Sequence, residues 1–111
     1  MRDLNKYDDF MDFLGDAFGA FGAIGQDEKL RDMLTENAGV AQIAARLCKE
    51  HREEVAEIVA AARGETVEEF RANYTTTALM RELVRLISNP DVTAVFRSVA
   101  AMRDEPSSAT L

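Results

Sequence analysis

Residues 37–64, NAGVAQIAARLCKEHREEVAEIVAAARG, decide the fold that we expect for this chain. Apolar side chains recur in this stretch at steps of three and four residues, including Ile43, Leu47, Val55 and Val59. This spacing is the 3.6-residue period of a half-buried helix. Ala, Glu, Arg and Leu fill most other positions, so the intrinsic helix propensity agrees with the pattern.

Both ends of the stretch carry residues that favour the ends of a helix. Asn37 is a candidate N-cap and Gly64 a candidate left-handed stop. A helix over about residues 38–63 would be roughly 35–40 Å long at 1.5 Å per residue, which is the span of a small domain. We therefore predict an all-α fold, a small single-domain bundle of five to six helices around this long central helix.

The composition places the chain among ordinary folded proteins. Its 111 residues are enough for one core, and 47% apolar with 30% charged residues is typical of globular domains. The net charge of −7 argues against nucleic acid and against an anionic membrane surface as partners, since both require basic residues. We expect one helical domain over residues 1–103 and a flexible polar C-terminal tail over residues 104–111.

The chain has features of an intracellular protein. Its single cysteine, Cys48, cannot form an internal disulfide, which suits a reducing cytoplasm. Because Cys48 falls on the apolar stripe, we expect a buried, unreactive thiol in preference to a reactive one. Charged residues occupy the start of the chain, where a signal peptide would be apolar. The longest apolar run, residues 13–25, is shorter than the ~20 residues that span a bilayer.

A first helix is expected over residues 4–24, where Tyr7, Leu14 and Phe21 are seven residues apart on one stripe. Phe13 lies off this stripe and is expected to point elsewhere. The segment also contains interior glycines, each of which costs about 0.8–1.0 kcal/mol relative to alanine in a helix.

Two interpretations of these glycines and phenylalanines remain open. In the first, the helix frays or breaks near Gly19 and the aromatic rings fill the core. In the second, the glycines let another backbone approach while the rings supply contact area to an oligomer or partner. The candidate contact residues are Phe10, Phe13, Phe18, Phe21, Gly15 and Gly19.

Four further helices are indicated by capping and turn chemistry. A short helix is expected within residues 26–36 with Asp27 near its cap, and a capping box of Thr66 and Glu69 predicts another. The sequence NYTTT at residues 73–77 should end that helix. A leucine-rich helix then runs to Ser88, and Asn89-Pro90-Asp91 begins the last one. No segment alternates with period two, so we expect no sheet.

The sequence offers no arrangement that catalysis or metal binding requires. The only histidine, His51, lies one turn from Glu54, and we expect a hydrogen-bonded pair at the edge of the core in preference to a metal ligand. There is no glycine-flanked serine, no phosphate-binding loop and no second histidine. We therefore expect a protein that is not an enzyme and holds no metal or cofactor.

The basic residues are concentrated late in the chain. Arg81 and Arg85 are one helical turn apart and would share a face. This face is either an ordinary solvated surface or a contact with the acidic end of a neighbouring copy or an acidic partner.

Taken in order, the motifs of residues 47–98 resemble those of the tail assembly chaperones of long-tailed bacteriophages. That family shows a K-x-H-[KR]-[ED]-E-[VL] helix, then G-x-[ST]-[VP]-E-E-[YF], a leucine-rich helix, N-[DP]-[PD] and a final helix with phenylalanine. The corresponding elements here are Lys49 to Val55, Gly64 to Phe70, Leu79 to Ile87, Asn89 to Asp91, and Phe96. The resemblance covers roughly residues 10–98 and includes the glycine- and phenylalanine-rich first helix. The segment NYTTTALMREL departs from the family, which more often has an apolar or proline-containing link there.

The resemblance implies a small helical protein made in the cytoplasm of the bacterial host and absent from the finished virion. Such a protein binds the tape measure protein, keeps its apolar helices soluble and recruits tail tube subunits, and it is expected to form a homo-oligomer. Many members are also made in a longer, frameshifted form. The alternative from a different class is a helical dimerising adaptor or regulator, such as the acidic antitoxin-like member of a toxin–antitoxin pair.

Overall fold

The computed structural model describes residues 1–36 and 38–103, and this part of the chain is all-helical. The all-α class is confirmed, but the predicted number of five to six helices is wrong, because the described residues form seven. The helices are α1 (Tyr7–Ile24), α2 (Glu28–Thr35), α3 (Val40–Glu50), α4 (Arg52–Arg63), α5 (Val67–Ala72), α6 (Thr76–Ser88) and α7 (Pro90–Arg103).

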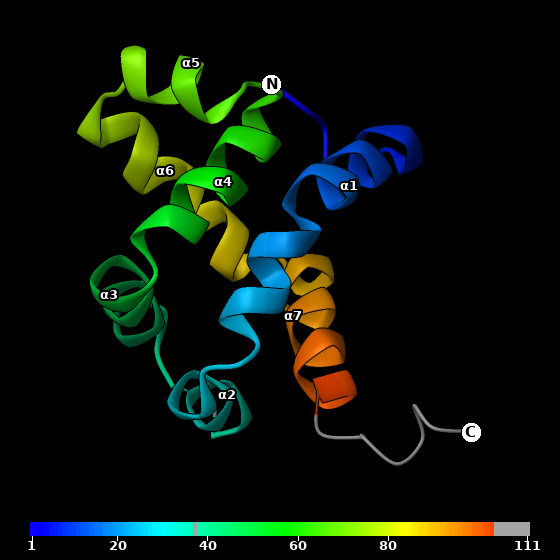
Figure 1. The fold of residues 1–111 in the computed structure, drawn as a ribbon, viewed down its shortest axis with the longest axis vertical. Helices are drawn as coiled ribbons and strands as arrows, with labels where there is room; N and C mark the ends of the chain where they lie inside the picture. The colour runs from blue at the N-terminus through cyan, green and yellow to red at the C-terminus, as the bar shows by residue number, and fades with distance from the viewer. Residues whose placement is uncertain (37, 104–111) are drawn as a thin grey trace.

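Helix α4 lies at the centre of the bundle (Figure 1). It packs most extensively against α1 and also contacts α3, α5 and α6. Helix α7 packs beside α1 and α6, and α2 contacts α3 and α7 at the far end of the molecule. The start of the chain is held to the end of α4, where the Arg2 amide donates to the Ala62 carbonyl at 3.1 Å.

The core is apolar, and each of the seven helices supplies side chains to it. The outer faces of α1 and α6 do not contribute to it. From the sequence pattern we expect Leu47, Val55, Val59, Leu83 and Phe96 to be buried. The first four are buried, whereas Phe96 is only half-buried at the edge of the core. The largest wholly buried apolar side chains are Phe13, Phe21, Ile24, Leu30 and Val59. Burying a side chain of this size stabilises the fold by about 1.5–3 kcal/mol.

The prediction of one long helix over residues 38–63 is wrong. His51 leaves the helical region with φ −134° and ψ 46°, so that α3 ends at Glu50 and α4 begins at Arg52. The His51 amide still donates to the Leu47 carbonyl at 2.8 Å, and its carbonyl accepts from the Val55 amide at 2.9 Å. The break therefore amounts to one residue, and no glycine or proline lies within either helix to cause it.

The helix ends predicted at Gly64, Thr66 and Asn89 are confirmed. Gly64 stops α4 in the left-handed conformation, with φ 72°. The Thr66 hydroxyl accepts from the Glu69 amide at 3.1 Å, and the Glu69 carboxylate accepts from the Thr66 amide at 2.8 Å, which completes the capping box of α5. The Asn89 side chain accepts from the Asp91 amide at 2.8 Å at the start of α7. The predicted cap at Asn37 and the predicted tail over residues 104–111 lie outside the described residues.

The first helix begins at Tyr7, later than the predicted residue 4, and runs without interruption to Ile24. The interpretation in which this helix frays or breaks near Gly19 is therefore wrong, although the other part of that interpretation, aromatic rings that fill the core, holds for Phe13 and Phe21. All the glycines before Gly25 thus lie within one continuous helix.

Candidate interaction surface

The outward face of α1 carries a line of exposed apolar side chains, which we call the α1 ridge and which consists of Tyr7, Met11 and Phe18. These side chains are 76%, 47% and 48% exposed, respectively. Their spacing of four and seven residues places them on one line along the helix. Among the described residues, no other helix carries as many exposed large apolar side chains.

A strip of glycines runs beside the α1 ridge and consists of Gly15, Gly19 and Gly22. A Cβ atom added at any of these three positions would meet nothing within 4 Å beyond the helix itself. Packing within the described chain therefore does not require glycine there. Gly25 differs, because a Cβ atom at that position would lie 3.2 Å from Val99 Cγ1 and 3.3 Å from the Phe21 carbonyl oxygen.

The side of the glycine strip that faces away from the α1 ridge is acidic, because Asp12 and Asp16 lie there. Asp8 lies in line with the glycines, two turns before Gly15, and all three carboxylates are exposed. Asp16 accepts a hydrogen bond from the Arg2 guanidinium at 2.7 Å. The outer face of α1 thus presents an apolar ridge, a flat strip without side chains and an acidic edge, in that order around the helix.

The structure separates the four phenylalanines that the sequence grouped together. Phe13 and Phe21 are wholly buried, Phe10 is half-buried and Phe18 is exposed. The Phe13 ring centroid lies 5.9 Å from those of both Phe10 and Phe21, and Phe21 stacks edge-on against Phe96 at 5.2 Å. The prediction that Phe13 lies off the buried stripe is wrong, and only Phe18 is largely free to meet a partner.

The rotation of α1 that buries Phe13 follows from small residues on both contacting helices. Ala17 and Ala20 of α1 are buried, as are Ala60 and Ala61 of α4, and these two helices share the most extensive contact in the fold. Short side chains on both sides let the helix axes approach closely. These alanines were the feature of the sequence from which the rotation of α1 could have been predicted.

Arg81 and Arg85 do not form a shared free face. The Arg85 guanidinium donates from Nε and Nη2 to Glu82 Oε1 at 3.0 and 2.7 Å, and Glu82 is only 1% exposed. Arg85 therefore neutralises a buried carboxylate within its own helix, while Arg81 is exposed to solvent. Charge-pair spacing at i and i+3 could have predicted this pair.

A polar cluster joins α2 to the junction between α3 and α4. Asp27 accepts from the Leu30 amide at 3.1 Å and from Nε and Nη2 of Arg46, both at 3.0 Å. His51 Nε2 lies 2.7 Å from Asp27 Oδ2, and His51 Nδ1 lies 3.3 Å from Glu54 Oε1. The predicted contact of His51 with Glu54 is confirmed, but Asp27 and Arg46 were missed because Asp27 is 24 residues away from His51.

The charge on Asp27 is strongly favoured in this cluster. Burial by itself would raise the pKa of its carboxyl, but the hydrogen bonds from Arg46, His51 and the Leu30 amide together lower that pKa well below its ordinary value of 3.8. The same contact raises the pKa of the Arg46 guanidinium. Because four donors surround the Asp27 carboxylate, it has little acceptor capacity left for a ligand. Within the described residues, no group of His, Cys, Asp and Glu side chains is placed to hold a metal ion.

Cys48 is exposed, so the prediction of a buried thiol is wrong. It lies at the rim of a shallow, mostly apolar groove between α3, α4, α5 and α6, whose floor includes Val55, Phe70 and Leu79. Arg52 also lines this groove.

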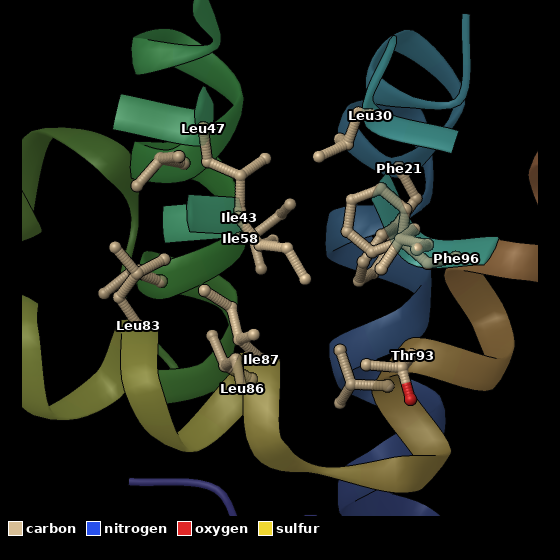
Figure 2. A pocket seen from close by; sticks show the side chains of 14 residues that line it. Phe21, Leu30, Ile43, Leu47, Ile58, Leu83, Leu86, Ile87, Thr93 and Phe96 are labelled. Carbon is tan, nitrogen blue, oxygen red and sulfur yellow. The ribbon is translucent and has the colours of Figure 1, made fainter. Parts of the chain in front are cut away.

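The interior contains an apolar cavity of about 30 Å³ between α3, α4 and α6 on one side and α1, α2 and α7 on the other. Figure 2 shows Ile43, Ile58 and Ile87 on one wall facing Phe21 and Phe96 on the other. Pockets for small-molecule ligands are about ten times larger or more. The cavity is therefore a packing defect, and the outer face of α1 is the better candidate site.

No helix among residues 1–36 and 38–103 is both long and apolar enough to cross a membrane. No family model, curated protein or solved structure matches the chain.

Proposed function

We propose that this protein is a tail assembly chaperone of the bacteriophage type that its motifs resemble. In this role it binds apolar helices of a tape measure protein, keeps them soluble and recruits tail tube subunits. The observation that carries the proposal is the outer face of α1, where three large apolar side chains lie exposed beside a strip of open glycines.

A chaperone for long apolar helices needs an apolar surface of its own on a scaffold that resists aggregation. The α1 ridge supplies that surface with the spacing by which helices engage one another along one face. The glycine strip allows a partner backbone to approach α1 closely, because no side chain stands between them. The acidic edge and the net charge of −7 keep loaded molecules apart by repulsion.

Three of the five motifs that carry the resemblance also coincide with junctions of the fold, which supports the proposal. Residues 49–55 span the break between α3 and α4, residues 64–70 form the turn into α5 together with the start of that helix, and residues 89–91 lie at the start of α7. In each of these three cases the motif residues have a structural task at a junction.

The test is co-expression of the protein with an apolar helical fragment of a tape measure protein. The double variant Met11→Ser, Phe18→Ser removes most of the α1 ridge without touching the core, so we expect a folded protein that leaves the fragment insoluble. The measurement is the fraction of the fragment in the soluble lysate and in complex with the purified protein.

The matched control is the double variant Met80→Ser, Tyr74→Ser. These two side chains are 45% and 49% exposed, so the control removes the same kind of surface from α6 and the preceding turn. We expect it to keep the fragment soluble. Equal loss in both variants, or loss in neither, would contradict the assignment of binding to α1.

A further inference from the structure

The break at His51 has no cause in the neighbouring sequence. Residues 40–63 contain neither glycine nor proline, and strong helix formers fill most of the positions on both sides of the histidine. Histidine is a poorer helix former than alanine but is tolerated inside helices. A tertiary contact must therefore hold the chain out of the helical conformation at this one residue.

The polar cluster around Asp27 is that contact. The Asp27 carboxylate, which caps α2, binds the imidazole of His51 at 2.7 Å and the guanidinium of Arg46 at 3.0 Å. Glu54, one turn into α4, lies 3.3 Å from the other imidazole nitrogen. The cluster thus ties α2, the end of α3, the junction and the start of α4 to a single point.

We propose that residues 40–63 form a two-state element, and that its state is set by the contact between His51 and Asp27, which we call the tie. With His51 bound to Asp27 the segment is broken into α3 and α4, and with the tie released it becomes one continuous helix. Only the dihedral angles of His51 need to change, from φ −134° and ψ 46° to about −63° and −42°. The residues on both sides are already helical.

The continuous state has its own source of stability. The first amides of α4, those of Arg52, Glu53 and Glu54, would gain the carbonyls of residues 48–50 as partners, because a helix bonds each amide to the carbonyl four residues before it. The apolar stripe also continues across the junction in helical register, from Ile43 and Leu47 to Val55 and Ile58. The straight helix would therefore keep one apolar face along its whole length.

The two states differ in how much apolar surface they cover. Helix α3 packs against α6 and supplies Ile43 and Leu47 to the wall that faces the interior cavity (Figure 2). Straightening the segment would draw α3 away from α6 and uncover Leu83 and Ile87. The element is thus a conformational device that is separate from the α1 ridge.

Amide hydrogen exchange distinguishes straightening from simple destabilisation. In His51→Ala the imidazole is lost and the best helix former replaces it, so we expect the amides of residues 52–54 to exchange about tenfold more slowly, or slower still, because they become hydrogen-bonded. His51→Gly is the matched control, because it removes the same imidazole but disfavours the helix. Its amides at residues 52–54 should exchange at least as fast as those of the unmodified protein.

A distance measurement provides the second readout and uses a different variant. Asp27→Ser keeps a good N-cap for α2 but is too short to reach His51 and Arg46. Spin labels at Ala41 and Glu57, both exposed, in a Cys48→Ser background report the separation of the two halves. In Asp27→Ser this separation should lengthen toward about 24 Å between Cα atoms, the value for sixteen helical steps of 1.5 Å.

The proposal is overturned if residues 52–54 exchange no more slowly in His51→Ala than in His51→Gly and the labels in Asp27→Ser do not move apart. If His51→Ala does not fold, the label distance in Asp27→Ser decides the question alone. An unchanged distance in that case also overturns the proposal.

Discussion

At the scale of single residues, Asp27 has three structural tasks. Its carboxylate caps α2, pairs with Arg46 and holds His51 at the junction of α3 and α4. A buried carboxylate without such donors would be unfavourable, since burial penalises the charged form. The donors reverse this penalty and make the ionised form the stable one in the folded protein.

The lowered pKa of Asp27 predicts an acid-sensitive contribution to stability. Because the pKa in the folded state lies below the ordinary value of 3.8, the contribution is fully present above that value and is lost as the pH falls below it toward the folded-state pKa. Urea unfolding between pH 7 and pH 2.5 should show a steeper loss of unfolding free energy for the unmodified protein than for Asp27→Asn. Parallel curves for the two proteins would show that Asp27 does not contribute in this way.

The glycine strip of α1 predicts a variant that gains stability. Gly19→Ala should raise the unfolding free energy by about 0.8–1.0 kcal/mol, because the added Cβ meets open space and alanine favours the helix. Gly25→Ala is the control and should give no such gain, since its Cβ would crowd Val99 and the Phe21 carbonyl. Chemical denaturation of both variants measures the difference. A destabilising Gly19→Ala would mean that the strip is already covered in the free protein.

Binding of a partner would explain why glycines that lower the stability of α1 occupy positions where packing within the chain does not require them. Residues that serve a partner are often poor for the stability of the free fold. If the strip admits a partner backbone, Gly19→Ala should also weaken retention of the tape measure fragment while stabilising the protein itself. These opposite effects would separate a binding role from a folding role.

At the scale of elements, α5 is a helix that is too short to be stable alone and that is stabilised by capping and by one buried side chain. It spans only Val67–Ala72, and isolated helices of that length are not populated in water. The reciprocal bonds of Thr66 and Glu69 satisfy two amides at its start, and buried Phe70 anchors it to the core. The capping bonds and the buried Phe70 ring together supply the stabilisation that so short a helix cannot obtain from its own hydrogen bonds.

Thr66→Ala should therefore destabilise the protein by about 0.5–2 kcal/mol, because it leaves an amide of the first turn without its acceptor. Thr77→Ala is a suitable control, since Thr77 is exposed within α6 and alanine is the better helix former there. The midpoints of urea unfolding of the two variants provide the comparison. Equal midpoints would show that the capping box contributes nothing measurable.

At the scale of the whole molecule, the contact between α1 and α4 decides which residues are available for function. Alanines on both helices bring them close together, and the resulting rotation of α1 directs Phe13 inward and Phe18 outward. The same rotation exposes the glycine strip. The candidate surface is therefore a consequence of how the core packs.

Because Phe13 points inward and Phe18 points outward, the same substitution at these two positions should have unequal effects on stability. Phe13→Ala should cost about 3–5 kcal/mol because it empties a wholly buried site, whereas Phe18→Ala should change stability by no more than about 0.5 kcal/mol. Thermal unfolding followed by circular dichroism measures both. A large loss in Phe18→Ala would place that ring in the core of the folded protein and remove it from the proposed binding surface.

The sequence by itself determined the all-α class and most of the helix ends in the described residues. Asp27, Gly64, Thr66 and Asn89 each act on backbone groups within about one helical turn, so their effect could be predicted from neighbouring residues. The glycine and phenylalanine content of α1 likewise drew attention to the element that carries the proposed surface.

Only the tertiary structure decided the break at His51, the direction of Phe13 and Phe18 and the exposure of Cys48. The break depends on a carboxylate 24 residues away, and the rotation of α1 depends on alanines of α4 that lie about forty residues further along the chain. Helical periodicity defines a stripe but leaves its rotation open when the apolar residues are spread over a wide arc, as they are in α1 from Phe13 round to Met11. The packing partner then decides which face is buried, because the side chains of two helices must interdigitate at native density.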